Sequence, residues 1–239
     1  MNIRILKTLI KKDCKSCISN KNVLFMLVVP VLFCVLYNYV FENAEAMTPM
    51  YTLQLCAIFC VSMIPTTVLP TMIAEEKEKN TLRSLILANV KGQEFLFAKL
   101  IVCMLLTLAD AVAVFFVAGA TVKNLSVYLF SVAISTGGLL FLGAVAGLLS
   151  KDQTSAGTIG SPLMMLAMIP PLFADMNKTI EKIAKVMPTT SFQTIFTTCI
   201  KGESLFVRNN VIAMLVCVIW MIAGFILFNI FYKRRGVDY

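Results

Sequence analysis

The stretch that decides the fold reads AEEKEKNTLRSLILANVKGQEFLFAK and runs from Ala74 to Lys99. It is rich in charged residues and lies between two apolar runs, each long enough to cross a bilayer as a helix. Its apolar residues recur at a spacing that allows a short amphipathic helix. A polar segment held between two spans is well placed to present itself to a partner in the cytoplasm, and that partner decides the function.

Composition places the chain among membrane proteins. Of the 239 residues, 59% are hydrophobic and 14% are charged, and the mean hydropathy is +0.84. These values lie outside the range of soluble globular domains. The net charge of +8 comes from basic residues that flank apolar blocks and form no patch interleaved with aromatic residues. The charge therefore indicates membrane topology, and we expect no nucleic-acid partner.

Several kinds of chemistry are excluded by missing motifs. The chain has no GxxxxGK[ST] sequence, so we expect any ATP and Mg²⁺ to bind a separate protein. It has no His, which removes histidine-based triads. Cys14 and Cys17 form a single CxxC that lacks the two further ligands of a zinc site. The sequence predicts no enzyme, no metal and no cofactor bound by this chain.

Six apolar runs meet the requirement of about 20 residues for a helical crossing. They are Val23–Phe41, Tyr51–Ile73, Phe97–Ala118, Val127–Leu149, Ile159–Ala174 and Val211–Tyr232. The fifth run is short, and we expect it to bend or break at Pro162, Pro170 and Pro171. The sequence therefore predicts an all-α integral membrane protein with six transmembrane helices in one domain, residues 1–239.

The distribution of Lys and Arg predicts the orientation. With six spans, fifteen of the 21 Lys and Arg residues fall on the side of both termini. The remaining six fall on the other side, mostly in one long connection, where charges count less. The positive-inside rule places both termini and the 74–99 segment in the cytoplasm of a multi-pass protein of the cell membrane.

Two cytoplasmic segments are expected to be helical. In residues 1–22, one helical face carries Ile3, Leu6, Ile10, Cys14 and Cys17. This interfacial helix either anchors the chain on anionic lipid headgroups or contacts a partner. In residues 74–97, Asn80 or Thr81 caps a short helix. Its acidic cluster is Glu75, Glu76 and Glu78, and its apolar face is Leu82, Leu85 and Ile86. This segment either transmits a push to its neighbours or is a solvated loop.

The connection at 175–209 is too long for a simple turn and predicts an outer helical hairpin. Ile180, Ile183, Ala184 and Met187 suggest its first helix. A second helix follows Pro188, with Thr190 or Ser191 as its cap and Gly202 as its stop. The two helices re-enter the membrane or cover a cavity on the outer side.

Polar and small residues within the spans are candidates for function. Asp110 is the acidic residue deep in the apolar runs, and it serves transport or bonds to another helix. Gly143 and Gly147 form a GxxxG that favours close packing within the chain. Two proline-rich regions, in the second and fifth spans, are the best candidates for lining a substrate cavity. The residues expected there are Phe59, Met63, Thr66, Thr67, Met164, Met165 and Met168.

The whole pattern resembles the type-2 ABC transporter permeases. The most specific parts are the sequence EEKEKNTL at 75–82, VKGQEF at 90–95 and Ala98-Lys99. The family usually has an acidic cluster, then Gly-Thr-Leu-Glu, and a Gly-Lys at the start of the next span. Here Asn80 replaces the Gly, Arg83 replaces the Glu, and Ala98 precedes Lys99.

The resemblance implies a function and partners. Two permease chains, identical or different, would pair, and each would dock on an ABC-type ATPase subunit. The N-terminal helix would be the connecting helix, and the 74–92 segment, including Lys91, the coupling element. Spans two and five would line a cavity that exports a peptide, drug or lipid-like substrate by alternating access, typically in bacteria. Two alternatives remain: an ion-coupled carrier or channel that uses Asp110, and a non-transporting scaffold or sensor.

Overall fold

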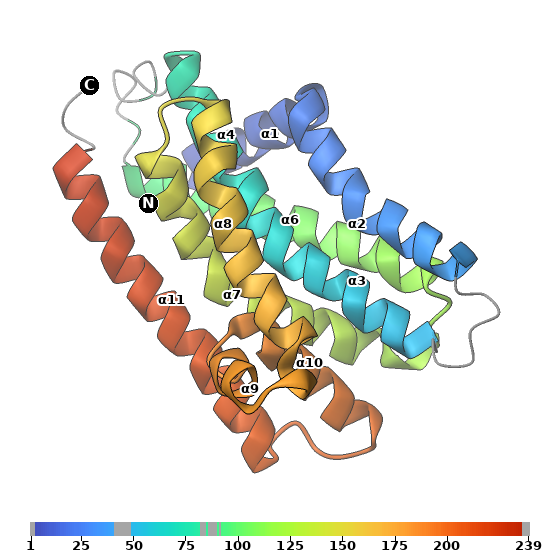
Figure 1. The fold of residues 1–239 in the computed structure, drawn as a ribbon. Helices are drawn as coiled ribbons and strands as arrows, with labels where there is room; N and C mark the ends of the chain where they lie inside the picture. The colour runs from blue at the N-terminus through green and yellow to red at the C-terminus, as the bar shows by residue number, and fades with distance from the viewer. Residues whose placement is uncertain (1–2, 41–48, 82–84, 86–89, 91, 236–239) are drawn as a thin grey trace.

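The computed structural model describes residues 3–40, 49–81, 85, 90 and 92–235 (Figure 1). Among these residues every regular element is helical, as the sequence predicts. Six helices are long and apolar enough to cross a membrane: Lys21–Val40, Pro49–Glu78, Glu94–Val117, Val122–Leu149, Gln153–Leu172 and Arg208–Tyr232. All six predicted spans are therefore confirmed. The second and fifth are longer than predicted, because the second runs on to Glu78 and the fifth begins at Gln153.

The first two helices meet at Asn20. Helix α1 (Ile3–Ser19) packs mainly against α6 (Gly92–Val117) at one end of the bundle, and α2 (Lys21–Val40) follows it directly. The buried positions of α1 are Leu9, Asp13 and Cys17. The predicted apolar face was partly wrong, since Ile3 is 77% exposed while the charged Asp13 is buried. Helix α1 packs its inner face against other helices of the protein. That face includes Asp13, which a search for apolar residues at helical spacing does not detect.

The second span is a helix of three parts. It consists of α3 (Pro49–Met63), a π-helical turn η1 (Ile64–Val68) and α4 (Leu69–Glu78). Pro65 lies in the first turn of η1, where its ring removes a backbone donor. The hydroxyls of Thr66 and Thr67 donate to the carbonyls of Ser62 and Met63, at 2.6 Å and 2.7 Å. The proline-rich middle of this span therefore carries hydroxyl side chains that bond to its own backbone, and its backbone irregularity is a π-helical turn.

The second span and α7 (Leu125–Leu149) form the centre of the bundle. The apolar window of the second span is 89% buried and that of the fourth is 72% buried, more than in any other span. A Cβ atom at Gly143 would collide with the carbonyl oxygen of Pro65, and one at Gly147 with Ile73. The GxxxG therefore allows close packing within the chain, as predicted.

Helix α8 (Gln153–Leu172) is continuous through its three prolines, so of the two expected outcomes, a bend or a break, the break is excluded. Pro171, in its last turn, cannot donate to the carbonyl of Ala167, and that carbonyl accepts from the Thr189 hydroxyl at 2.5 Å instead. Its beginning is fixed by a capping box in which Asp152 accepts from the backbone N–H of Ser155 at 2.7 Å. These bonds explain why α8 starts several residues before the predicted span.

The predicted hairpin at 175–209 contains two helices, α9 (Lys178–Ala184) and α10 (Pro188–Ile200), preceded by the short turn η3 (Ala174–Met176). They lie at the end of the bundle away from α1 (Figure 1). Helix α10 packs against α7 and against α11 (Arg208–Arg235). The predicted cap was wrong, because α10 is capped at Met187 with Pro188 in its first turn. Gly202 follows the helix with φ of 86°, as a stop signal requires.

Replacing Gly143 with Ala tests the close contact between α7 and η1. The new Cβ has no room beside the Pro65 carbonyl, so we expect the free energy of unfolding to fall by about 1–3 kcal/mol. Gly157→Ala is the control, because nothing lies within 4 Å of its Cβ position. That variant should change stability by less than about 1 kcal/mol. Unfolding of the purified chain in detergent measures both, and equal effects would contradict the contact.

Candidate functional site

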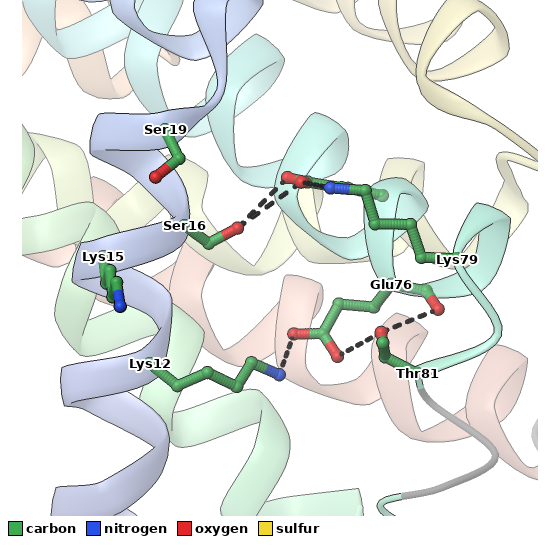
Figure 2. A pocket seen from close by; sticks show the side chains of 8 residues that line it. Lys12, Lys15, Ser16, Ser19, Glu76, Lys79 and Thr81 are labelled. Carbon is green, nitrogen blue, oxygen red and sulfur yellow. Dashed lines mark hydrogen bonds and ion pairs between the residues drawn. The ribbon is translucent and has the colours of Figure 1, made fainter.

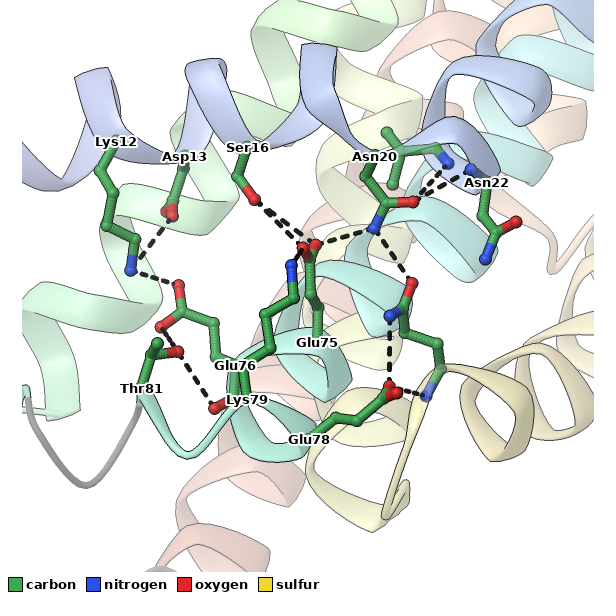
Figure 3. Close-up of polar contacts among 12 residues, drawn as sticks. Lys12, Asp13, Ser16, Asn20, Asn22, Glu75, Glu76, Glu78, Lys79 and Thr81 are labelled. Carbon is green, nitrogen blue, oxygen red and sulfur yellow. Dashed lines mark hydrogen bonds and ion pairs between the residues drawn. The ribbon is translucent and has the colours of Figure 1, made fainter.

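The candidate site is a group of polar contacts at the end of the second span. Its centre is the sequence Glu75, Glu76, Lys77 and Glu78, which we call the 75–78 junction. Each of these four consecutive residues bonds to a different part of the helix bundle. Figure 3 shows the contacts of Glu75, Glu76 and Glu78. Successive helical residues point about 100° apart, so a run of four reaches neighbours all around the axis.

Glu76 takes part in a buried ion-pair group. Its Oε1 accepts from Nζ of Lys99 at 2.9 Å and from Nζ of Lys12 at 2.6 Å. Lys99 also donates to Oδ1 of Asp13 at 3.2 Å. The side chains of Lys99 and Asp13 are each only 2% exposed. One ammonium group therefore joins the end of α4 to α1 and α6 inside the protein.

The charge balance of this group is tight. Burial raises the pKa of Asp13, and the nearby Glu76 carboxylate raises it further. The ammonium groups of Lys99 and Lys12 act in the opposite direction and lower this pKa. The ionised form of Asp13 is thus costly, and the two ammonium groups limit that cost. Lys99 also lies 5.1 Å from the centre of the Phe95 ring, which adds a cation–π contact.

Glu75 connects the second span to the joint between α1 and α2. Its Oε2 accepts from the side-chain amide of Asn20 at 2.8 Å, and the same amide donates to Oε1 of Gln153 at 3.0 Å. The Oδ1 atom of Asn20 accepts from the backbone N–H of Asn22 at 3.0 Å, at the first turn of α2. Lys79 also bonds to Glu75. A single asparagine therefore contacts the starts of two spans and the end of a third.

Lys77 and Glu78 hold α7 and α8. The ammonium group of Lys77 donates to the carbonyls of Gly147, Leu148 and Ser150, at 3.1, 2.6 and 2.9 Å. These are carbonyls at the C-terminal end of α7, which favours a cation. The Oε2 atom of Glu78 accepts from the backbone and side-chain N–H groups of Gln153, at 3.3 Å and 3.2 Å. A carboxylate at the first residue of α8 suits the positive end of that helix.

The chain leaves the junction through Asn80, which has a φ of 54°. This left-handed conformation is usual for Gly after a helix, and Asn is one of the other residues that tolerate it. The expectation that Asn80 or Thr81 caps the next helix involves residues 82–84, which lie outside the described residues. The Thr81 hydroxyl bonds back to Glu76, at 3.1 Å from both the carbonyl oxygen and Oε2.

The rest of the predicted coupling helix is only partly described. Thr81 and Leu85 are helical, and Leu85 is half-buried. Leu82, Ile86 and Lys91 lie outside the described residues, as do the other positions of 82–84 and 86–89.

A pocket lies between α1 and the end of α4 (Figure 2). Its volume is about 330 Å³. It is lined by Lys12, Lys15, Ser16, Ser19, Glu75, Glu76, Lys79 and Thr81. Among the described residues, no three His, Cys, Asp or Glu side chains are placed to hold a metal ion.

The residues predicted to line a substrate cavity do not share one surface of this single chain. Thr66 and Thr67 are buried, and a Cβ at Gly160 of α8 would collide with the Thr66 carbonyl. Phe59 is stacked on Phe33 of α2, with ring centres 5.1 Å apart. On α8, Met165 is 52% exposed. Met63, Met164 and Met168 are half-buried. Helix α8 therefore covers the threonines of the second span.

Asp110 lies within α6 and is 7% exposed. Its Oδ2 atom has no hydrogen-bond partner among the described residues. The hydroxyl of Tyr128, on α7, is likewise buried and without a partner there. Neither residue belongs to the 75–78 junction.

Sequence reasoning missed the partners of the junction. Asp13, Asn20 and Gln153 were not candidates, and Lys99 entered only through its family motif. One signal was present: Asp13 lies midway between Leu9 and Cys17 at helical spacing, on the face that the structure buries. Asn20 and Gln153 offered none, because their partners are distant in the sequence.

A family model for the ABC-2 family of transporter proteins matches residues 44–232. The chain belongs to this family. The predicted family is therefore confirmed, and the chain is a multi-pass membrane protein and a membrane transport subunit. Helices α1 and α2 precede the matched residues. A search of curated proteins found no match.

Replacing Lys99 with Met tests the buried ion-pair group. The change leaves Glu76 and Asp13 buried without their shared cation, so we expect the free energy of unfolding to fall by about 3–5 kcal/mol. Lys79→Met is the matched control, because its ion pair with Glu75 has a lysine that is 60% exposed. Such surface pairs contribute at most about 1 kcal/mol. Denaturant unfolding in detergent compares the two, and similar losses would show that burial of Lys99 is unimportant.

Proposed function

We propose that this transport subunit is the permease of an ATP-driven exporter, and that a separate ATPase subunit drives it at the 75–78 junction. The observation that carries the proposal is that four consecutive residues bond to α1, α6, α7 and α8 and to Asn20 at the joint between α1 and α2. A displacement applied to the segment that follows would reach these four helices and the joint together. An ordinary solvated loop would need none of these bonds.

The proposed partner lies in the cytoplasm. The positive-inside rule puts the junction, α1 and both termini on that side. This chain has no P-loop, so ATP and Mg²⁺ would bind the ATPase. Closure of the ATPase would press on α1 and on the segment after Asn80. The ion pairs that join α1 to α4 and α6 inside the protein would carry the movement.

The second span is the proposed path of transmission. Its end is fixed at the junction by charged bonds, and its middle contains the π-turn η1. Turns of this kind occur often at functional sites, since their backbone bonds can rearrange. Movement of the fixed end would thus change the backbone conformation at η1, where α8 covers Thr66 and Thr67.

Alternating access would follow from movement of α8. The exposed face of α8 includes Met165, Leu166 and Ile169. In a pair of permease chains this face would meet the cavity. Tilting of α8 would add Thr66 and Thr67 to its lining. A surface of Met, Phe and Thr suits a peptide, a drug or a lipid-like substrate.

Glu78→Ala tests coupling at the junction. The carboxylate is exposed and holds only the start of α8, so the variant should fold and still purify with the ATPase. We expect transport per ATP hydrolysed to fall severalfold, because α8 loses both bonds from Gln153 to α4. Glu181→Ala is the control, an exposed acid paired with Lys185 at the other end of the bundle. Failure of the wild-type chain to purify with any P-loop ATPase would overturn the proposal.

A second candidate, an ion-coupled carrier, is favoured by the buried Oδ2 atom of Asp110 that lacks a partner among the described residues. Such a carrier would move substrate in proteoliposomes under a proton or sodium gradient without ATP. Asp110→Asn should abolish that flux. Under the exporter proposal, flux depends on the ATPase and on ATP, and a gradient alone drives none.

A further inference from the structure

The pocket between α1 and the end of α4 has acids at its base, but these acids are already bonded. Glu75 accepts from Asn20, Ser16 and Lys79. Glu76 accepts from Lys12, Lys99 and Thr81. Both carboxylates are buried, with 6% and 5% exposure. Donors of this chain thus already occupy the two carboxylates. A further cation would find few acceptor positions still open on them.

The groups that remain accessible in this pocket are hydrogen-bond donors. Lys15 and Ser19 are exposed, and among the described residues no hydrogen bond or ion pair satisfies their side chains (Figure 2). The side chains of Lys12 and Lys79 are 40% and 60% exposed. Each ammonium group has three donors, and neither uses all of them on the carboxylates. Three ammonium groups and a free hydroxyl therefore surround one small space.

The pocket also lies at the depth of the lipid headgroups. Helix α2 begins at Lys21, two residues after Ser19, and its 20 residues span about 30 Å at about 1.5 Å per residue. That length equals the hydrocarbon thickness of a bilayer, about 30 Å. The apolar surface of α2 starts at once, with Leu24 40% and Phe25 72% exposed. The residues just before α2 therefore fall in the layer that holds phosphates.

We propose that this pocket binds a phosphate group, from the headgroup of an anionic lipid or from free phosphate. Lys15 and Ser19 bind it, and the spare donors of Lys12 and Lys79 complete its contacts. Charged donors are well matched to phosphate oxygens. A bound phosphate ties α1 to the end of α4 from outside, opposite the internal bridge made by Lys99. The proposed phosphate site does not depend on the proposed function, although it lies on α1, one of the elements on which the ATPase would press.

Ligand stabilisation of the purified full-length chain in detergent tests this site. One arm adds phosphatidylglycerol against phosphatidylcholine, and the other adds inorganic phosphate against chloride at equal ionic strength. A ligand that binds the folded chain raises its unfolding midpoint. We expect Lys15→Gln and Ser19→Ala each to weaken the apparent affinity about fivefold. Lys178→Gln, an exposed lysine on α9, should leave the affinity unchanged.

The outcomes distinguish a lipid headgroup from free phosphate, and both from contact with a protein. Stabilisation by inorganic phosphate identifies a free anion, and stabilisation by phosphatidylglycerol alone identifies a lipid. The proposal is overturned if neither ligand stabilises the wild-type chain, or if Lys15→Gln and Lys178→Gln have equal effects. It is also overturned if Lys15→Gln weakens only co-purification with the ATPase, since the pocket then contacts protein. None of these results bears on the Glu78 coupling test, so the two proposals fail independently.

Discussion

The burial of Lys99 between Glu76 and Asp13 is the constraint on which the rest of the junction depends. A charge removed from water is tolerated only while its partners stay in place, so α1, α4 and α6 must keep their register at this point. Fixing Glu76 also fixes the rotation of the last turn of α4. Glu75, Lys77 and Glu78 then point toward Asn20, α7 and α8, because successive helical residues are about 100° apart. The buried ion pairs of Lys99 thus determine which neighbour each residue of the run meets.

The number and type of the spans were predictable because long apolar runs can satisfy their backbone only as helices in a membrane. The boundaries were not. The predicted second span stops at Ile73, where the charges begin, but the helix continues to Glu78. The rule that charges end a span assumes that they seek water. Here Glu75 and Glu76 find protein partners, and the helix continues. The start of α8 shifted for a related reason, since Asp152 and Ser155 cap it and Gln153 bonds to Glu78.

The site was predictable only in part. The acidic cluster was recognised from its place between two spans, and Asn80 from its departure from a family motif. The structure gives that departure a physical reason, because Asn at φ of 54° does what Gly does after a helix. Asp13 was missed because the search for an amphipathic helix counts apolar residues on one face. An acid on that face counts against burial, although here the acid is buried with a partner. Asn20 and Gln153 are 133 positions apart, and no local rule joins them.

The packing around η1 suggests how a fixed end and a movable middle coexist in one span. Gly143 of α7 lies against the Pro65 carbonyl, and Gly160 of α8 lies against the Thr66 carbonyl. Backbone therefore meets backbone at two points of the π-turn. Interlocked side chains resist sliding, because each must leave its hole before the helices can move. A glycine has no side chain of its own to withdraw. Under the proposed function, the second span would be held by charges at the junction and would move against α7 and α8 at η1.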